Sequence, residues 1–300
     1  MKTFANAWRV TDVRAIPGDS AFLLDNGKTA ILFDSGFGFT GQRIAENIRC
    51  VLGCRSLDYI FLSHSHYDHA LASVAVHDAY PTAKIAAGAH AAHIFEKPTA
   101  RAVMREMDCK CAAANGITDH PDDTARLHVD FALSDGETVP GTDFRVVALP
   151  GHTRCSVGYY DENSGLLLSS ETLGVFYGED GYIPAFLVGY EMTLASFARA
   201  RELDITAMLL PHRGLITGDA VTTFLSESER VTRETAAWIL DRIHAGMTDE
   251  EILTEYTAHV YSTSLAEAYP PDAFRLNSSI MIGVVRRELG REMILSSTVQ

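Results

Sequence analysis

The segment from His64 to His69, with the sequence HSHYDH, places four potential metal ligands within six residues. It directly follows Leu57–Leu62, an apolar run that predicts a short buried strand. Because side chains alternate along an extended chain, His64 and His66 project to the same side and can reach one cation. The chain then turns, so that Asp68 and His69 can face a second cation nearby. The sequence therefore predicts a fold that places a metal centre at a strand end, and imidazole with carboxylate suits zinc, iron or manganese.

Three more potential ligands each follow an apolar, strand-like run. A histidine after a strand is by itself a weak signal, and only the order of the three segments after the first cluster links them to it. Because ligand sites form where loops leave the strand ends of one sheet edge, we expect these side chains to lie beside the first cluster. They are His152 in Leu149–Thr153 (LPGHT), Glu171 in Leu168–Thr172 (LSSET) and His212 in Leu210–Gly214 (LPHRG).

Strands and helices alternate along the chain, which predicts a mixed α/β fold. A turn at Asp25–Gly27 between two apolar runs indicates a hairpin of Ser20–Leu24 and Thr29–Phe33. The last strand of the core is expected at Ala207–Leu210, and from Val221 the chain is expected to be mostly helical. Further helices are predicted over Thr40–Leu52, Ala70–Tyr80, Pro98–Ala114 and Glu191–Glu202, and further strands over Lys84–Ala87, Asp130–Leu133, Phe144–Leu149, Ser156–Tyr160 and Leu166–Ser169.

The order of these motifs resembles that of the metallo-beta-lactamase superfamily. The resemblance covers roughly residues 15–220 and rests on the HxHxDH pattern at His64–His69, on the PGHT segment, and on Asp34–Gly36 upstream. It implies a four-layer αβ/βα sandwich, in which two mixed sheets face each other, helices cover the outside and a metal site lies at one edge. We therefore expect a metallo-beta-lactamase-like domain over residues 1–220. A mostly helical C-terminal extension over residues 221–300 is expected to pack on the same domain.

Carried over position by position, the resemblance assigns seven ligands to two metal ions. Two positions depart from the family. The bridging acid is usually Asp, and Glu171 is one methylene longer. The last histidine usually lies in a Gly-His-Gly setting, whereas here Pro211 precedes it and Arg213 follows it. Both departures bear on which metal binds and on how fully the second site is occupied. The implied first-metal ligands are His64, His66 and His152, the implied second-metal ligands are Asp68, His69 and His212, and Glu171 takes the bridging position.

Two cations held a few ångströms apart explain the chemistry of such a site. They polarise a carbonyl or phosphoryl oxygen and lower the pKa of a bridging water toward neutrality, which supplies hydroxide as the nucleophile. Asp68 can both bind a metal and orient that hydroxide, so it is the predicted catalytic residue. Asp34, at a strand end, is the predicted acceptor that holds a ligand imidazole in one tautomer. We expect two divalent metal ions, zinc first, with iron or manganese as the alternatives.

The composition of the chain restricts the kinds of partner that the protein can bind. Lys and Arg number 25 against 39 Asp and Glu, a formal net charge of −14 that argues against a broad nucleic-acid surface. No apolar run reaches the length of about 18 residues that predicts a membrane span. The segment Met1–Asp12 does not resemble a secretory signal. We therefore expect a cytoplasmic protein that acts on a small molecule, without nucleic-acid or membrane partners, and a homo-oligomer stays open.

Hydrolysis of a small ester, thioester or related substrate is the predicted reaction. Ester, thioester, lactone and phosphodiester substrates all occur in the superfamily that the sequence resembles. The acidic charge disfavours nucleases, and no feature of the sequence marks a true β-lactamase. The helical stretch Ser226–Ala258 resembles the helical tails of thioesterase-like members.

A di-iron oxidoreductase is the alternative, because Leu166–Gly174 resembles the matching stretch of flavodiiron proteins. Those proteins carry Glu at the position of His66 and need an attached flavodoxin-like domain, for which this chain has no length. A third interpretation is a non-catalytic metal-binding module. Against it, all seven ligand positions hold residues that can bind a metal.

Overall fold

The computed structural model describes residues 8–178 and 181–290, except for the side chains of residues 267 and 268. Residues 1–7, on which part of the signal-peptide interpretation rests, and residues 291–300 of the expected C-terminal extension lie outside the described residues. The chain divides into two compact units. Unit 1 comprises the residues up to 148 together with 155–170 and 204–221, and unit 2 comprises 149–154, 171–203 and the residues from 222 onward.

Unit 1 contains two mixed β-sheets. In the six-stranded sheet the strands follow chain order, with β1 to β3 antiparallel and β3 to β6 parallel. The hairpin predicted around the Asp25–Gly27 turn is the β2–β3 pair, in which Phe22 lies opposite Phe33. The strands are β1 (Arg9–Asp12), β2 (Phe22–Asp25), β3 (Ala30–Phe33), β4 (Tyr59–Leu62), β5 (Lys84–Gly88) and β6 (Phe131–Leu133).

The second sheet of unit 1 has five strands in the order β13-β12-β9-β8-β7. The neighbours β9 and β12 are parallel, and the other pairs are antiparallel. The expectation that Ala207–Leu210 is the last core strand is wrong, because the chain turns at His212 and returns as β13 beside β12. A four-residue strand directly after a polar turn is too short to give a periodic signal in the sequence. The strands are β7 (Phe144–Ala148), β8 (Val157–Asp161), β9 (Leu166–Leu168), β12 (Ala207–Leu210) and β13 (Gly214–Thr217).

The two sheets face each other across an apolar core to which both contribute buried side chains. Phe61 of the six-stranded sheet stacks on Tyr159 of the five-stranded sheet, with ring centroids 4.6 Å apart. The Tyr159 hydroxyl donates to the carbonyl oxygens of Leu62 and Ala86, at 2.9 and 3.1 Å. Burial, together with the charge of Asp34, raises the pKa of Tyr159 well above its usual value, so the hydroxyl stays a donor. This side chain therefore joins the sheets by packing and by hydrogen bonds.

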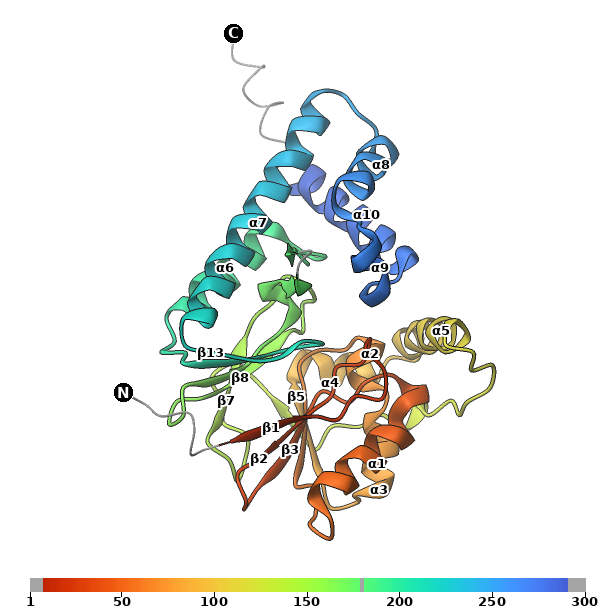
Figure 1. Ribbon diagram of the computed structural model, residues 1–300, viewed down its shortest axis with the longest axis vertical. Helices are drawn as coiled ribbons and strands as arrows, with labels where there is room; N and C mark the ends of the chain where they lie inside the picture. The colour runs from red at the N-terminus through yellow and green to blue at the C-terminus, as the bar shows by residue number, and fades with distance from the viewer. Residues whose placement is uncertain (1–7, 179–180, 291–300) are drawn as a thin grey trace. The chain divides into compact units, whose positions relative to one another are not determined.

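The other face of the six-stranded sheet packs against helices (Figure 1). Because side chains alternate along a strand, Leu23 and Leu32 face the helices while their neighbours face the second sheet. Helix α1 buries Ile44 and Ile48 against this face. The helices of unit 1 are α1 (Gly41–Leu52), α2 (Tyr67–Ala70), α3 (Ser73–Ala79), α4 (Ala89–Phe95) and α5 (Pro98–Ala114), with 3-10 turns η2 (Gly38–Thr40) and η3 (Thr124–Arg126).

The helix predicted over Ala70–Tyr80 is α3, which begins only at Ser73, whereas Ala70 is the last residue of the separate helix α2. Between the two helices, the backbone N–H of Ala72 donates to the carbonyl oxygen of Gly36 at 3.2 Å. This bond ties the loop after the histidine cluster to the loop after β3, a long-range contact that periodicity cannot reveal. The helix predicted over Pro98–Ala114 is confirmed with its bounds, and proline occupies its first turn.

Unit 2 is mostly helical and has an apolar core of its own. Tyr256 of α8 stacks on Phe274 of α10, with ring centroids 5.9 Å apart. The short hairpin β10–β11 was not predicted. The elements are η4 (Glu171–Leu173), β10 (Val175–Phe176), β11 (Tyr182–Ile183), α6 (Tyr190–Arg201), α7 (Asp219–His244), α8 (Asp249–Val260), α9 (Thr263–Ala268) and α10 (Pro271–Glu288), of which α7 begins in the last residues of unit 1.

The predicted fold class, mixed α/β with a helical C-terminal region, is confirmed. The domain ranges 1–220 and 221–300 stay a prediction, since unit 2 joins the C-terminal helices with two segments from inside the first range. Across the described part of the chain, no helix combines the length and the apolar character needed to cross a bilayer.

Replacing Tyr159 with Phe should lower the free energy of unfolding by about 1–3 kcal/mol, because two buried carbonyl groups lose their donor. Urea unfolding followed by circular dichroism measures the loss. Tyr59→Phe is the matched control, since its hydroxyl donates to the Pro140 carbonyl at an exposed position where water can replace it. Equal losses in the two variants would contradict the role assigned to Tyr159.

Candidate metal centre

The carboxyl ends of β3 and β4 lie side by side at one edge of the six-stranded sheet, because these strands are parallel. Asp34 follows β3, and Ser63 and His64 follow β4. The Ser63 carbonyl oxygen accepts a hydrogen bond of 2.9 Å from the backbone N–H of Val157, the first residue of β8. This bond brings an edge of the five-stranded sheet to the same place, so loops from both sheets of unit 1 meet here.

Asp34 is fully buried, and its carboxylate accepts four hydrogen bonds. Oδ1 accepts from the backbone N–H of Ser63 at 2.8 Å. Oδ2 accepts from the hydroxyls of Ser20 and Ser63, at 2.9 and 3.1 Å, and from Nδ1 of His69 at 2.7 Å. The backbone φ of 53° is left-handed, a strained conformation for a residue other than glycine, and surrounding bonds must stabilise it. The predicted hydrogen bond from an imidazole to Asp34 is present, with His69 as the donor, and the role of His69 as a metal ligand stays a prediction.

These hydrogen bonds fix the tautomers of two histidines. An ionised carboxylate only accepts, so His69 must donate from Nδ1 and its Nε2 carries the lone pair. Ser63 donates its hydroxyl proton to Asp34, so His64 must donate from Nδ1 to the Ser63 oxygen, 2.9 Å away. One buried carboxylate therefore leaves the Nε2 atoms of both imidazoles as potential metal ligands.

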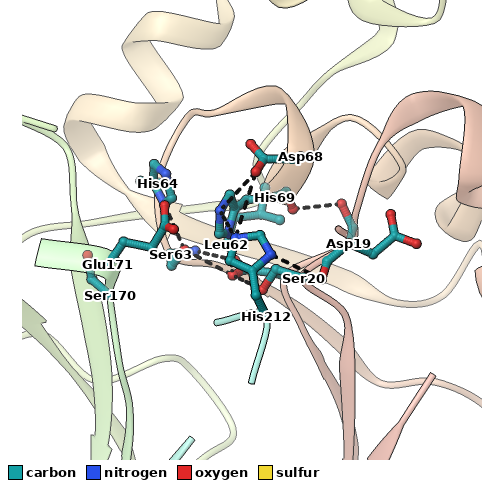
Figure 2. A network of polar contacts seen from close by, with 12 residues as sticks. Asp19, Ser20, Leu62, Ser63, His64, Asp68, His69, Ser170, Glu171 and His212 are labelled. Carbon is teal, nitrogen blue, oxygen red and sulfur yellow. Dashed lines mark hydrogen bonds and ion pairs between the residues drawn. The ribbon is translucent and has the colours of Figure 1, made fainter. Parts of the chain in front are cut away.

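His212 follows β12 of the five-stranded sheet, and its ring faces His69 (Figure 2). Its Nδ1 lies 3.1 Å from the carbonyl oxygen of Asp19, which only accepts, so the proton is on Nδ1 and the lone pair on Nε2. The Nε2 atoms of His212 and His69 are 3.2 Å apart. Two lone pairs at this distance repel each other unless a proton or a cation lies between them.

Asp68 completes a group of three donors, with Oδ2 3.6 Å from Nε2 of His69 and 3.7 Å from Nε2 of His212. Tetrahedral coordination with metal–ligand bonds of about 2.0–2.2 Å places ligand atoms about 3.3–3.6 Å apart. The observed separations of 3.2, 3.6 and 3.7 Å are close to that spacing. These three side chains therefore fit a zinc-sized divalent cation in both chemistry and spacing.

His66 lies beside His64, with ring centroids 4.5 Å apart. Its backbone is extended, with φ −74° and ψ 151°, and it directly precedes α2. His66 is thus presented by extended chain, whereas His64 lies in a bend and Asp68 and His69 belong to the helical turn that follows. The four predicted ligands of the cluster therefore differ in their backbone conformation.

Unit 2 brings together the two remaining predicted ligands. Nδ1 of His152 donates to the carbonyl oxygen of Ala185 at 3.0 Å, and its Nε2 lies 3.0 Å from Oε2 of Glu171. Gly151, which precedes the histidine, has a φ of 144°, and a Cβ there would lie 2.1 Å from the hydroxyl oxygen of Thr193. The PGHT segment therefore needs its glycine for close packing. Here too a carbonyl group accepts from Nδ1 of the imidazole, which leaves Nε2 of His152 as a potential metal ligand beside the Glu171 carboxylate.

Sequence reasoning missed Asp19 and Ser20. Burial raises the pKa of the Asp19 carboxyl, although hydrogen bonds from Phe37 and Thr40 among others act in the opposite direction. These two residues form no recognised motif. The only signal in the sequence is a polar pair directly before a strongly apolar strand.

The structure places the seven predicted ligands in two sets. Unit 1 brings Asp68, His69 and His212 together and holds the other two histidines of the cluster beside them. Unit 2 pairs His152 with Glu171. The assignment of all seven to one dinuclear centre, and the catalytic role of Asp68, stay predictions.

The sequence matches the family model of the metallo-beta-lactamase superfamily over residues 18–212. This match covers more than half of the chain, and the chain therefore belongs to this superfamily. No curated protein matches the sequence.

Solved structures show the same fold at low sequence identity. A metallo-beta-lactamase family protein from Thermus thermophilus is 21% identical with a TM-score of 0.58, and the match covers 90% of this chain and 88% of that one. An archaeal superfamily protein from Sulfolobus tokodaii is 17% identical with a TM-score of 0.55, over 77% and 86% of the two chains. A mutant flavo di-iron protein from Thermotoga maritima is 17% identical with a TM-score of 0.51, over 77% of this chain and 56% of that one.

Asp34→Asn should weaken metal binding by about 10–100-fold, as is usual when the partner of a ligand imidazole is lost, because an amide cannot accept from all four donors. Competition with a chromophoric zinc chelator measures the affinity. Asp130→Asn is the control, because that carboxylate binds Lys84 at the surface and should leave metal affinity unchanged. Unchanged affinity in Asp34→Asn would show that this carboxylate does not support the ligands.

Proposed function

We propose that this chain is a metal-dependent hydrolase that uses two divalent metal ions, expected to be zinc, to activate water against a small ester, thioester or related substrate. The observation that carries the proposal is the convergence of Asp68, His69 and His212 at separations suited to one cation. Nδ1 of His69 donates to Asp34, and Nδ1 of His212 donates to the carbonyl oxygen of Asp19. The Nε2 atoms of both imidazoles are therefore directed to the place where a cation would bind. Membership of the superfamily supports the same conclusion.

The first metal is proposed to bind His64, His66 and His152, with Glu171 between the two ions. His64 and His152 each donate from Nδ1 to a protein oxygen, which leaves Nε2 for a metal. The path of the chain supports the grouping. Residues 149–154 follow the end of β7 and lead back to β8, whose first residue is bonded to the carbonyl group next to His64.

When bound, two divalent cations polarise the scissile carbonyl group and lower the pKa of the attacking water. The side chains of the protein supply position and charge. Asp68 has one carboxylate oxygen near the two imidazoles, and its second oxygen can accept a hydrogen bond from the attacking water and orient it toward the carbonyl carbon. Asp34 keeps His69 in one tautomer and balances positive charge that the ligands share.

A small, uncharged or weakly charged substrate fits the net charge of −14, which repels large polyanions. We also propose that the protein is cytoplasmic and acts without a nucleic-acid or membrane partner, and its oligomeric state stays open.

The alternative function is a di-iron oxidoreductase related to the flavodiiron metal domain. The likeness to the Thermotoga flavo di-iron protein concerns the fold, and His66 stands where the flavodiiron pattern has Glu.

The purified protein, loaded with zinc, should hydrolyse at least one member of a panel of activated esters and thioesters. A chelator should abolish the activity, and added zinc should restore it. His66→Ala should reduce metal content and activity together, because it removes a proposed ligand, whereas His90→Ala removes a surface histidine on α4 and should change neither. Binding of iron alone, with oxygen consumption and no hydrolysis, would favour the di-iron alternative.

Glu171 is tested by two substitutions that separate charge from length. Glu171→Gln keeps the length and removes the charge, while Glu171→Asp keeps the charge and shortens the arm by about 1.5 Å. If the charge holds two cations together, Glu171→Gln should lose more metal than Glu171→Asp, as measured by elemental analysis of the desalted proteins. Full metal content in Glu171→Gln would exclude a bridging role.

A further inference from the structure

His212 lies in the short turn between β12 and β13, far along the chain from the other ligands of unit 1. Its backbone φ of 60° is in the left-handed region that residues other than glycine rarely adopt. Its side chain is 12% exposed, whereas that of His69 is fully buried over Asp34. The turn alone does not explain why Nε2 of His212 is held 3.2 Å from Nε2 of His69.

Arg14 holds the backbone of this turn. Its Nη1 donates to the carbonyl oxygen of His212 at 2.5 Å and to that of Pro17 at 3.2 Å. Its Nε and Nη2 donate to the carboxylate of Asp12, at 2.9 and 2.6 Å. The guanidinium also lies over the ring of Phe22, 5.3 Å from its centroid. A planar group fixed on three sides in this way can position the carbonyl that it binds.

Asp19 holds the imidazole of the same residue, because its carbonyl oxygen accepts from Nδ1 of His212 (Figure 2). The Asp19 carboxylate is fully buried and fixes the position of that carbonyl group. One oxygen binds the turn before it and the other binds the loop after β3. The donors are the backbone N–H groups of Ala15 and Ile16, at 2.9 and 3.0 Å, and the backbone N–H of Phe37 and the hydroxyl of Thr40, at 3.1 and 2.8 Å.

Ser20 connects the same segment to the other two ligands. Its backbone N–H donates to the carbonyl oxygen of Asp68 at 3.4 Å. Its hydroxyl donates at 2.9 Å to the Asp34 carboxylate, which in turn holds His69. The nine residues 12–20 therefore contact Asp68 and His212 directly and His69 through Asp34. We call Asp68, His69 and His212 the second-metal triad.

We propose that residues 12–20 form an N-terminal clamp, consisting of Asp12, Arg14, Asp19 and Ser20, that positions the second-metal triad. Arg14 and Asp19 are positioning residues for His212, since they act through its backbone and its Nδ1 and supply no metal ligand. The clamp rests on the proposed two-metal function. Through Arg14 and Asp19, which contact His212, the clamp sets the affinity of the second metal and not of the first.

The test is a chelator-competition titration of the full chain with zinc. Arg14→Met keeps the length and the apolar contact with Phe22 but removes every donor. Arg9→Met is the matched control, because that arginine also pairs with a carboxylate, Asp25, but is 66% exposed and does not contact His212. His212→Ala identifies which binding event belongs to the second metal.

Arg14→Met should weaken by about 10–100-fold the event that His212→Ala removes, as for other groups that orient a ligand, and leave the other event unchanged. Arg9→Met should leave both unchanged. Wild-type affinity for both metals in Arg14→Met, or equal loss of both in a folded protein, would overturn the clamp. If Arg14→Met does not fold, Arg14→Lys is tested in its place, with the same expected loss of the second binding event. A lysine can donate hydrogen bonds but cannot bind Asp12 and the carbonyl oxygen of His212 with one planar group.

The titration and the ester panel separate the two proposals. Two zinc-binding events without hydrolysis would contradict the hydrolase and leave the clamp standing. Hydrolysis with an unchanged second event in Arg14→Met would contradict the clamp and leave the hydrolase standing. Nitrogen NMR of the metal-free protein shows whether Nδ1 of His212 carries a proton, which is a further readout. A ring protonated at Nε2 but not at Nδ1 would contradict the role of Asp19.

Discussion

The buried carboxylate of Asp34 is the interaction on which the candidate site depends. It accepts from His69 directly and orders His64 through the hydroxyl of Ser63, so one charge fixes two imidazoles. A buried charge is costly unless hydrogen bonds compensate it, and here four donors do so. The left-handed backbone of this residue adds strain of a kind that is found most often at functional sites.

The sandwich of unit 1 places these groups together. The parallel pair β3–β4 brings Asp34 beside the histidine cluster, and the bond between Ser63 and Val157 adds an edge of the second sheet. From that sheet His212 arrives after β12, and the segment before β2 holds it through Arg14. The fold of unit 1 therefore brings the predicted ligands of this unit to one edge of its sheets. The stacked rings and hydrogen bonds of the inter-sheet core keep the two halves of that edge in register.

Local patterns predicted much of this arrangement, and long-range contacts explain what they missed. The hairpin, helix α5 and the role of Asp34 followed from turn residues, periodicity and a polar residue at a strand end. Strand β13 was missed because four residues after a polar turn carry no periodic signal. The helix predicted from Ala70 begins only at Ser73, because the bond from Ala72 to Gly36 that precedes it leaves no signal in the sequence. Asp19 and Arg14 were missed for the same reason, since their function depends on a histidine in a distant turn.

Anomalous diffraction from crystals grown with zinc would show directly whether the side chains at this edge bind two metal ions. We expect two peaks about 3.5–4 Å apart, as in other two-metal sites. One peak should lie within about 2.0–2.2 Å of Asp68, His69 and His212. Absence of a peak at these three side chains, in crystals of protein that retains zinc, would contradict the proposed second metal site. A proton, and not a metal ion, would then lie between the two Nε2 atoms that are 3.2 Å apart.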